Sequence, residues 1–291
     1  MIDYSRIKGK IWLDGKYIKC NQAKLHVLSH GLHFGSAVFE GIRVYNKQPF
    51  RIDEHLNRLY NSALLVGYKI PTKFPKLKKI CFNIIKLQNL NNGYLRPVAW
   101  RGSQSMAPTS KNCKIHLSVA GWGWPTYYSA NAKSKGISLD VSKWIKYKKN
   151  NFPVKSKCAS FYTTHTLAKI AAEKKKYDDS LMLDENQNVC ETTSSNIFFI
   201  GRKTLYTPKP ENFIDGITRK IIFNLCKKNK IKVLEKNIKL KDIKKYQACF
   251  ITGTAAEVTP IKKIKSKKFD VKNKTLLNVM GLFQNLINSK F

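Results

Sequence analysis

The chain has 291 residues, of which 43% are hydrophobic, so it is long enough for two domains with substantial cores. It contains no apolar run of about 18 residues, which argues against a membrane span. Its formal charge of +36 suggests nucleic-acid binding, but the lysines are spread along the chain instead of forming one basic stripe with interleaved aromatic residues. We therefore treat a basic nucleic-acid-binding protein as the less favoured interpretation.

The cysteines and the N-terminus bear on the compartment. Seven cysteines, an odd number, occur without a Cys-x-x-Cys pair, which is typical of reduced thiols. Residues 1–6 lack an apolar segment and a small-residue cleavage site, so we expect no secretory signal. These features favour a cytoplasmic protein.

Hydrophobic periodicity and turn residues predict the elements of the first part of the chain. The Asp14-Gly15 turn indicates a hairpin, and Asp53 opens a helix in which Leu56 and Leu59 recur at helical spacing. The expected elements are a hairpin at residues 10–19, a strand at 37–45, helices at 53–66 and 76–90, and strands at 94–100 and 114–120.

Residues 121–128, with the sequence GWGWPTYY, interrupt this order, and we interpret them as a connection between domains. We expect a smaller N-terminal α/β domain at 1–120, a connector at 121–133 and a larger C-terminal domain at 134–291. The later elements expected are strands at 137–142, 180–183, 196–200, 204–206, 231–234 and 248–252, and helices at 162–176, from 217 onward, and at 276–287. This mixture predicts an α/β or α+β fold.

Lys157 is the candidate reactive amine, because it stands between a proline-ended strand and an aromatic-led helix. A lysine acts as a nucleophile only as the free amine, so burial and positive neighbours that lower its pKa would favour this role. Lys155 and the pair Lys148 and Lys149 could be those neighbours. The alternative is a solvated surface lysine, since Lys and Arg together number 54.

Glu191 is the candidate buried acid. Asp and Glu together number only 18, and Glu191 lies between the apolar pair Val189 and Cys190 and a Thr/Ser turn at residues 192–195. A buried carboxylate needs a partner, and a carboxylate opposite a pyridine nitrogen would keep that nitrogen protonated. The alternative is an ordinary strand-end glutamate bonded to the hydroxyl groups that follow it.

Two turns offer backbone N–H groups to an anion. Gly216, Ile217 and Thr218 open an expected helix, whose first N–H groups and dipole favour a phosphate, and Arg58 could add its charge. The run GTAA at residues 253–256 also lets a ligand approach the backbone, and a tight turn without a ligand is the alternative.

His30 and His33 flank two residues, a spacing that could suggest a metal site. No acid or cysteine accompanies them at ligand spacing, so we expect packing or hydrogen bonding instead of a metal.

Three longer motifs carry a resemblance to a known family. They are SHGLHFGSAVFEGIR at residues 29–43, YLRP at 94–97 and GTAAEVTP at 253–260. Together with Lys157 and Glu191 they resemble the branched-chain-amino-acid aminotransferases of the class IV family of pyridoxal-phosphate enzymes, over residues 11–260. The chain departs from that family at residues 160–162, where Ser-Phe-Tyr replaces Gly-Asn-Tyr, and in the Thr/Ser turn.

The resemblance implies a two-domain class IV fold that binds pyridoxal 5'-phosphate between the domains. Lys157 would hold the cofactor covalently and shuttle the substrate proton, while Glu191 and Tyr162 would pair with the pyridine nitrogen and the phenolic oxygen. The residues implied to bind its phosphate are Arg58, Ile217, Thr218 and Thr254.

The same resemblance implies reversible ping-pong amino transfer between leucine, isoleucine or valine and 2-oxoglutarate, which yields branched-chain 2-oxo acids and glutamate. Tyr94 and the Thr254-Ala255 backbone would receive the substrate carboxylate, and Arg96 would receive the distal carboxylate of glutamate. The implied apolar pocket comprises Phe39, Trp124 and Tyr127. The implied assembly is a homodimer or a higher homo-oligomer whose second subunit completes the site.

Three other functions are alternatives. A D-amino-acid aminotransferase and an aminodeoxychorismate lyase are the nearest, and the motifs VFEGIR at 38–43 and YLR at 94–96 argue against both. A basic nucleic-acid-binding protein on a degraded enzyme scaffold belongs to a different class, and it would bind DNA or RNA with steep salt dependence and without cofactor absorbance.

Overall fold

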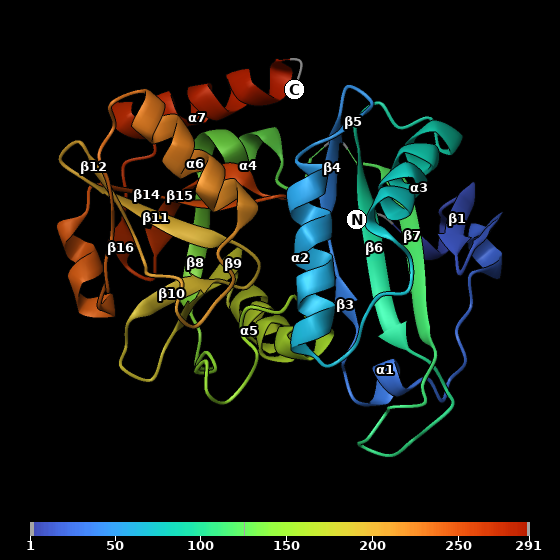
Figure 1. Ribbon diagram of the computed structural model, residues 1–291. Coiled ribbons are helices and arrows are strands. Elements are labelled where there is room, and N and C mark those ends of the chain that lie inside the picture. The colour runs from blue at the N-terminus through green and yellow to red at the C-terminus, as the bar shows by residue number, and fades with distance from the viewer. Residues whose placement is uncertain (1–2, 125, 290–291) are drawn as a thin grey trace. The chain divides into compact units, whose positions relative to one another are not determined.

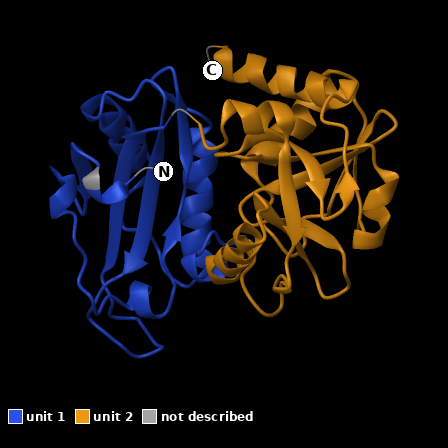
Figure 2. Cartoon of the chain, turned by 180° about the vertical axis from the view of Figure 1, so that it is seen from behind, with its two compact units in different colours: residues 1–125, 156–161, 291 blue, residues 126–155, 162–290 orange. Residues whose placement is uncertain are grey.

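The computed structural model describes residues 3–124 and 126–289, and the chain divides into two units (Figures 1 and 2). Unit 1 contains the described residues of Met1–Pro125 together with Ser156–Phe161, and unit 2 contains those of Thr126–Lys155 and Tyr162–Lys290. Lys157 therefore belongs to unit 1 and Glu191 to unit 2. The domain boundaries expected from the sequence, which placed both residues in the C-terminal domain, stay a prediction.

Unit 1 is built on a seven-stranded sheet in the order β2-β1-β7-β6-β4-β5, with β3 also paired to β6. Its strands are β1 (Lys10–Leu13), β2 (Lys16–Lys19), β3 (Val38–Phe39), β4 (Ile42–Tyr45), β5 (Gln48–Pro49), β6 (Gly93–Arg101) and β7 (Ile115–Gly123). The predicted hairpin is confirmed as β1 and β2. Asp14 and Gly15 both have positive φ, as a tight two-residue hairpin turn requires.

Two amphipathic helices pack against the unit 1 sheet and supply many of the residues of its core. Helices α2 (Ile52–Leu65) and α3 (Phe74–Leu87) confirm the two predicted helices, and Leu59 and Ile84 are fully buried against strand residues such as Leu95. Figure 1 shows both helices beside this sheet. A further helix, α1 (His30–His33), was not predicted, because four residues are too few to show a periodicity.

Unit 2 is built on a nine-stranded sheet in the order β10-β9-β8-β15-β14-β11-β12-β13, with β16 paired to β15. The strands are β8 (Ile137–Val141), β9 (Asp179–Leu183), β10 (Val189–Thr192), β11 (Asn196–Gly201), β12 (Thr204–Thr207), β13 (Val233–Glu235), β14 (Ala248–Gly253), β15 (Glu257–Ile264) and β16 (Lys267–Lys268). Strand β8 runs parallel to β9 and β15. The inner strands are buried along most of their length, which explains their continuous apolar runs.

The helices of unit 2 are α4 (Ala130–Lys135), α5 (Tyr162–Lys174), α6 (Ile217–Lys228) and α7 (Lys274–Asn288). Short 3₁₀-helices occupy Tyr4–Arg6, Cys20–Gln22, Ala159–Phe161 and Leu240–Lys245. Helices α5, α6 and α7 confirm the predicted ones, and the mixture of helix and sheet in both units confirms the predicted fold class. No helix within residues 3–124 and 126–289 is long and apolar enough to cross a bilayer.

Three expectations differ from the structure. The strand expected at 37–45 is interrupted at Glu40 and Gly41, between β3 and β4. Strand β15 was not predicted, because residues 257–264 were interpreted mainly as part of a turn motif. Residues 121–123 continue β7 instead of leaving the sheet, and a Cβ on Gly121 would lie 2.6 Å from Ile84 Cγ2. Glycine is needed there because a helix approaches the strand closely. In the sequence, the same glycine was interpreted as the end of the strand.

Candidate active site

The backbone of Lys157 is fixed within unit 1 by neighbours that are distant in the sequence. Phe39 N–H donates to the Lys157 carbonyl oxygen at 3.1 Å, and Ala159 N–H donates to Ala37 O at 2.7 Å. On the other side, Lys157 N–H donates to Ser62 Oγ of α2 at 2.9 Å. The lysine is therefore held between β3 and α2, and it does not lie on a free surface loop.

The side chain of Lys157 is half-buried, and its Nζ lies 5.1 Å from the centroid of the Phe39 ring. Burial, and after it the charges of Arg58 and Arg96, lower the pKa of the Lys157 amine to about 8, against the opposing effect of Glu40. Near neutral pH an appreciable fraction of this amine is therefore free, which is the state that a nucleophilic lysine needs.

The positive neighbours of Lys157 are two arginines and not the lysines expected from the sequence. Lys155 Nζ donates to the carbonyl oxygen of Pro210, and Lys148 forms an ion pair with Glu185 at 2.6 Å. Sequence proximity suggested these lysines, whereas Arg58 and Arg96 come from other elements of unit 1.

A buried cluster fixes Arg58. Its Nε and Nη2 donate to the two oxygens of Glu40 at 2.5 and 2.9 Å, and His55 Nδ1 donates to Glu40 Oε2 at 2.7 Å. Burial alone would raise the pKa of the fully buried Glu40, but the charge of Arg58 and the contact with His55 hold it well below its usual range. Burial lowers the pKa of His55, so the ring is neutral and its Nδ1 carries the donated hydrogen.

Sequence reasoning missed Glu40 as the partner of Arg58, although the residue stands in the quoted motif at 29–43. The available signal was its place among the apolar residues Val38, Phe39 and Ile42, because an acid buried there needs a cation or a donor.

Aromatic rings and one cation line the same part of unit 1. The guanidinium carbon of Arg96 lies 4.8 Å from the Phe39 ring centroid and 5.4 Å from the Tyr94 ring centroid. The rings of Tyr94 and Trp124 meet edge to face at 4.7 Å. The structure therefore brings Lys157 and four predicted substrate residues together in one unit.

In unit 2, Glu191 is buried on β10 and has a cationic partner. Lys146 Nζ donates to Glu191 Oε1 at 2.6 Å and also contacts His165 Nε2 at 2.8 Å. The ring of Tyr162, at the start of α5, meets the His165 ring at 5.2 Å. The need for a partner is confirmed, but that partner is Lys146, which sequence reasoning missed.

Lys146 gave no recognisable signal in the sequence, because it lies in a lysine-rich run and its partner is 45 positions away. The alternative bonding for Glu191, to the hydroxyl groups that follow it, is not the one observed. Thr192 Oγ1 donates to Ser195 O instead.

The predicted phosphate turn forms the N-terminus of α6, with Gly216 as its N-cap. Asn196 Oδ1 accepts the Gly216 N–H at 3.1 Å, and Asn196 Nδ2 donates to Ile214 O at 3.1 Å. A Cβ on Gly216 would lie 2.2 Å from Asn196 Oδ1. The first N–H groups of a helix, here those of Ile217 and Thr218, have no carbonyl partner within the helix and can donate to an anion.

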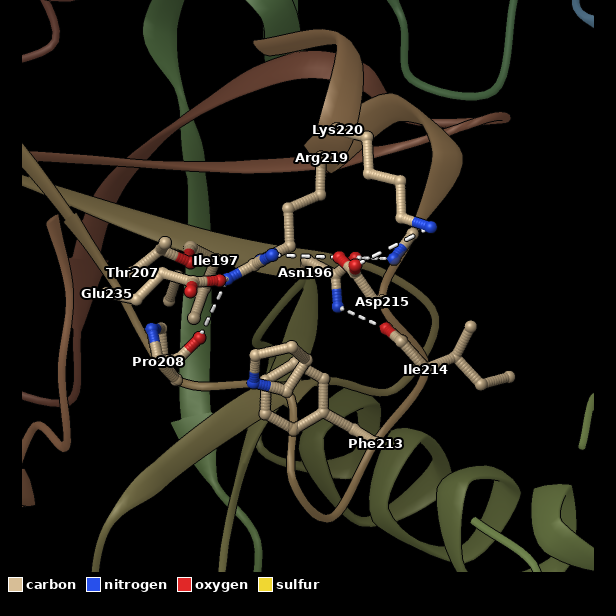
Figure 3. A network of polar contacts seen from close by, with 12 residues as sticks. Asn196, Ile197, Thr207, Pro208, Phe213, Ile214, Asp215, Arg219, Lys220 and Glu235 are labelled. Carbon is tan, nitrogen blue, oxygen red and sulfur yellow. Dashed lines mark hydrogen bonds and ion pairs between the residues drawn. The ribbon is translucent and has the colours of Figure 1, made fainter. Parts of the chain in front are cut away.

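A buried arginine anchors the same turn. Arg219 Nη1 donates to Asp215 Oδ1 at 2.8 Å, and its Nη2 donates to Pro208 O at 3.0 Å and to Glu235 (Figure 3). These contacts tie the loop before α6 to the helix and to β13, so the N–H groups are presented by a rigid segment.

The remaining predicted site residues also lie in unit 2. Thr254 and Ala255 are half-buried in the turn between β14 and β15. A Cβ on Gly253 would lie 3.0 Å from Ser195 Oγ, so this turn lies beside the Thr/Ser turn that follows Glu191. Tyr127 is exposed, with its ring edge to face against Tyr128 at 4.8 Å.

The histidines and cysteines have ordinary environments. His30 Nε2 bonds with Ala107 O at 3.2 Å and His33 Nε2 with Val27 O at 2.9 Å, as the hydrogen-bonding interpretation predicted. All seven cysteines are free thiols, which confirms that prediction. The described part of the chain contains no cluster of three or more His, Cys, Asp or Glu that could hold a metal ion.

Comparisons with known proteins identify the family of the chain. Residues 37–264 match the family described as amino-transferase class IV. The chain is 37% identical over 265 residues to the probable branched-chain-amino-acid aminotransferase of Rickettsia felis, covering 91% of this chain and 90% of that protein. It is 33% identical over 264 residues to the branched-chain-amino-acid aminotransferase of Pseudomonas aeruginosa, covering 89% and 86%.

A solved structure shows the same fold. The crystal structure of a T.th. branched-chain amino acid aminotransferase with pyridoxamine 5'-phosphate has a TM-score of 0.92 and 31% identity, over 97% of this chain and 94% of that chain. The protein therefore belongs to the class IV aminotransferase family.

Proposed function

We propose that this protein is a branched-chain-amino-acid aminotransferase that uses pyridoxal 5'-phosphate. It transfers an amino group reversibly, by a ping-pong mechanism, between leucine, isoleucine or valine and 2-oxoglutarate. The observation that carries the proposal is the Lys157 amine, whose pKa is lowered to about 8 beside the Phe39 ring and within reach of the charge of Arg96.

Each unit carries residues that we assign to the cofactor. We assign Lys157 as the group that bonds to it, Glu191 as the partner of its pyridine nitrogen and Tyr162 as the partner of its phenolic oxygen. The phosphate would be bound by Arg58 and Thr254 and by the N–H groups of Ile217 and Thr218. This assignment is supported by the fixed guanidinium of Arg58, the rigid N-terminus of α6 and the buried carboxylate of Glu191.

The cofactor and the side chains of the protein would contribute different parts of the reaction. When bound, pyridoxal phosphate supplies an electron sink for the negative charge that develops at the substrate α-carbon. Lys157 Nζ takes the proton from that carbon, and its lowered pKa suits the amine to accept and return a proton near neutral pH. Glu191 keeps the ring nitrogen protonated, because a buried carboxylate favours a positive charge opposite it.

The substrate residues suit two different side chains. Phe39, Trp124 and Tyr127 offer apolar surface to leucine, isoleucine or valine, while Arg96 offers a cation to the distal carboxylate of glutamate. Arg96 lies over the Phe39 ring, so the apolar wall and the cation are adjacent. Tyr94 and the Thr254-Ala255 backbone would receive the carboxylate that all substrates share.

We further propose a cytoplasmic location and assembly as a homodimer or higher homo-oligomer. The free thiols support the first proposal. Exposed apolar side chains at residues 25–34 support the second, because several large apolar side chains exposed in one segment are typical of an interface. These side chains are Leu25, Val27, Leu28, Leu32 and Phe34.

Substrate selection tests the proposed function. Steady-state rates should be high with L-leucine and 2-oxoglutarate and negligible with D-alanine. Arg96→Met should raise KM for 2-oxoglutarate about tenfold or more, the scale of a lost charged contact, and should change the leucine half-reaction much less. Faster turnover of D-alanine, or of aminodeoxychorismate, would assign the protein to a different class IV activity.

A further inference from the structure

Lys146 is an unusual lysine in this chain. It is 4% exposed, whereas most of the lysines lie on the surface. Its ammonium contacts Glu191 Oε1 and His165 Nε2, and both of these partners are buried as well. Burying a lysine is costly unless it has a specific partner, so its position beside Glu191 calls for a functional explanation.

The hydrogen bonds of this cluster have a defined direction. An ammonium group only donates, so His165 Nε2 accepts from Lys146 and His165 Nδ1 carries the hydrogen. That hydrogen is donated to Thr193 O at 2.8 Å, and Thr193 Oγ1 donates to Asp179 Oδ1 at 2.5 Å. Lys146 is thus held by a chain of buried groups anchored on β9, α5 and the turn after β10.

The two oxygens of Glu191 are not equivalent. Oε1 accepts from Lys146 at 2.6 Å and lies 4.0 Å from His165 Nε2. Oε2 has no hydrogen-bond partner within residues 3–124 and 126–289. One oxygen is therefore occupied by the chain itself, and the other is available to a ligand.

We propose that Lys146 is a positioning residue for the transamination site, which holds Oε1 of Glu191 and thereby presents Oε2 to the cofactor ring nitrogen. This inference rests on the proposed function. Without the ammonium, Glu191 would lose the donor that fixes Oε1, and a carboxylate that can turn would no longer be held in place to pair with the proton on the ring nitrogen. His165 contributes by fixing the ammonium on the Oε1 side.

The direct test is the protonation state of the ring nitrogen in the loaded protein. Pyridoxal phosphate labelled with ¹⁵N in the ring would be bound to wild type, Lys146→Met, Lys146→Arg and the control Lys148→Met. The control removes an exposed lysine that pairs with Glu185. We expect the protonated ¹⁵N shift in wild type, Lys146→Arg and Lys148→Met, and a shift toward the unprotonated position in Lys146→Met.

Cofactor affinity gives a second readout. The dissociation constant should rise about tenfold or more in Lys146→Met, as expected for one lost charge-assisted hydrogen bond, and should stay near wild type in the control. If Lys146→Met fails to fold, Lys146→Gln also removes the ammonium that holds Oε1 and should show the same ¹⁵N shift.

The apoprotein provides a measurement that is independent of the cofactor. With ¹³C-labelled glutamate carboxyl groups, the Glu191 signal is identified by its loss in Glu191→Gln. It should move in Lys146→Met, which removes the donor to Oε1, and should keep its wild-type position in Lys148→Met. An unmoved signal would overturn the inference even if the wild type bound no cofactor.

The two proposals fail in different ways. If wild type binds no pyridoxal phosphate, or binds it with an unprotonated ring nitrogen, the proposed function or the role of Glu191 is wrong. If wild type holds a protonated ring nitrogen and Lys146→Met holds it equally well, only the role of Lys146 is wrong.

Discussion

The charged amine of Lys157 lowers the free energy of unfolding of the protein. Its pKa is lowered from 10.5 to about 8, mainly because burial removes the charged form from water. A difference of this size corresponds to about 3 kcal/mol. Because the unfolded chain binds the proton more tightly, this cost is fully present below pH 8 and disappears as the pH rises to 10.5.

Replacing Lys157 should therefore stabilise the protein without its cofactor. Lys157→Met should raise the free energy of unfolding by roughly 2–3 kcal/mol at pH 7, and the gain should shrink steadily above pH 8. Urea unfolding of both proteins from pH 7 to 9.5 measures this, with Lys148→Met as the control for loss of a surface lysine. An equal gain at pH 7 and pH 9.5 would contradict the burial of this amine.

Glu40 should be the most sensitive acid in unit 1. Glu40→Gln leaves the guanidinium of Arg58 without its buried counter-ion, so we expect a loss of roughly 3 kcal/mol in the free energy of unfolding. Glu54→Gln breaks only an exposed pair with Arg51 and should cost less than about 1 kcal/mol. Chemical denaturation compares the two variants, and equal losses would show that Glu40 has no special role.

At the scale of elements, sequence patterns predicted the helices and turns that are stabilised by contacts between residues close in the sequence. The hairpin of β1 and β2 and the helices α2 and α7 follow from turn residues and apolar spacing, so they could be predicted. At the break between β3 and β4, Gly41 leaves room for Tyr94, whose hydroxyl oxygen would lie 1.7 Å from a Cβ on Gly41. Such contacts join residues far apart in the sequence, and a single sequence gives no sign of them.

In the candidate site, too, some residues could be predicted from the sequence and others depend on contacts between distant positions. Lys157 and Glu191 could be predicted because they stand in sequence motifs whose residue types suit a catalytic amine and a buried acid. Their partners could not be predicted in the same way. Arg58 meets Glu40 across 18 positions and Glu191 meets Lys146 across 45, so only the fold reveals which charges are paired.

The N-terminus of α6 should tolerate no side chain at Gly216. In Gly216→Ala the new Cβ would displace Asn196 Oδ1 and break its bond to the backbone, which should cost about 1–2 kcal/mol and weaken cofactor binding. Gly281→Ala in α7 is the matched control, because its Cβ meets no atom within 4 Å. That change should stabilise the helix by roughly 0.5–1 kcal/mol. Thermal unfolding and cofactor titration separate the two effects, and normal cofactor affinity in Gly216→Ala would count against this phosphate site.

At the scale of the whole molecule, the exposed apolar residues at 25–34 bear on assembly. Val27 is 67% exposed in this structure, and a charge there should prevent a second copy from covering the segment. We expect Val27→Asp to sediment as a monomer while wild type and Leu277→Asp, a change of an exposed leucine on α7, sediment as oligomers. A monomeric wild type would contradict the proposed assembly.

The central claim is that Lys157 supports amino transfer from a branched-chain amino acid. The most direct test is a single half-reaction, in which protein loaded with pyridoxal phosphate is mixed with L-leucine and no acceptor. We predict loss of the visible absorbance band of the lysine-bound cofactor, release of one equivalent of the 2-oxo acid of leucine, and recovery of the band when 2-oxoglutarate is added. Lys157→Ala should bind the cofactor without that band and release no 2-oxo acid. An unchanged spectrum in wild type, or product release by Lys157→Ala at the wild-type rate, would contradict the account.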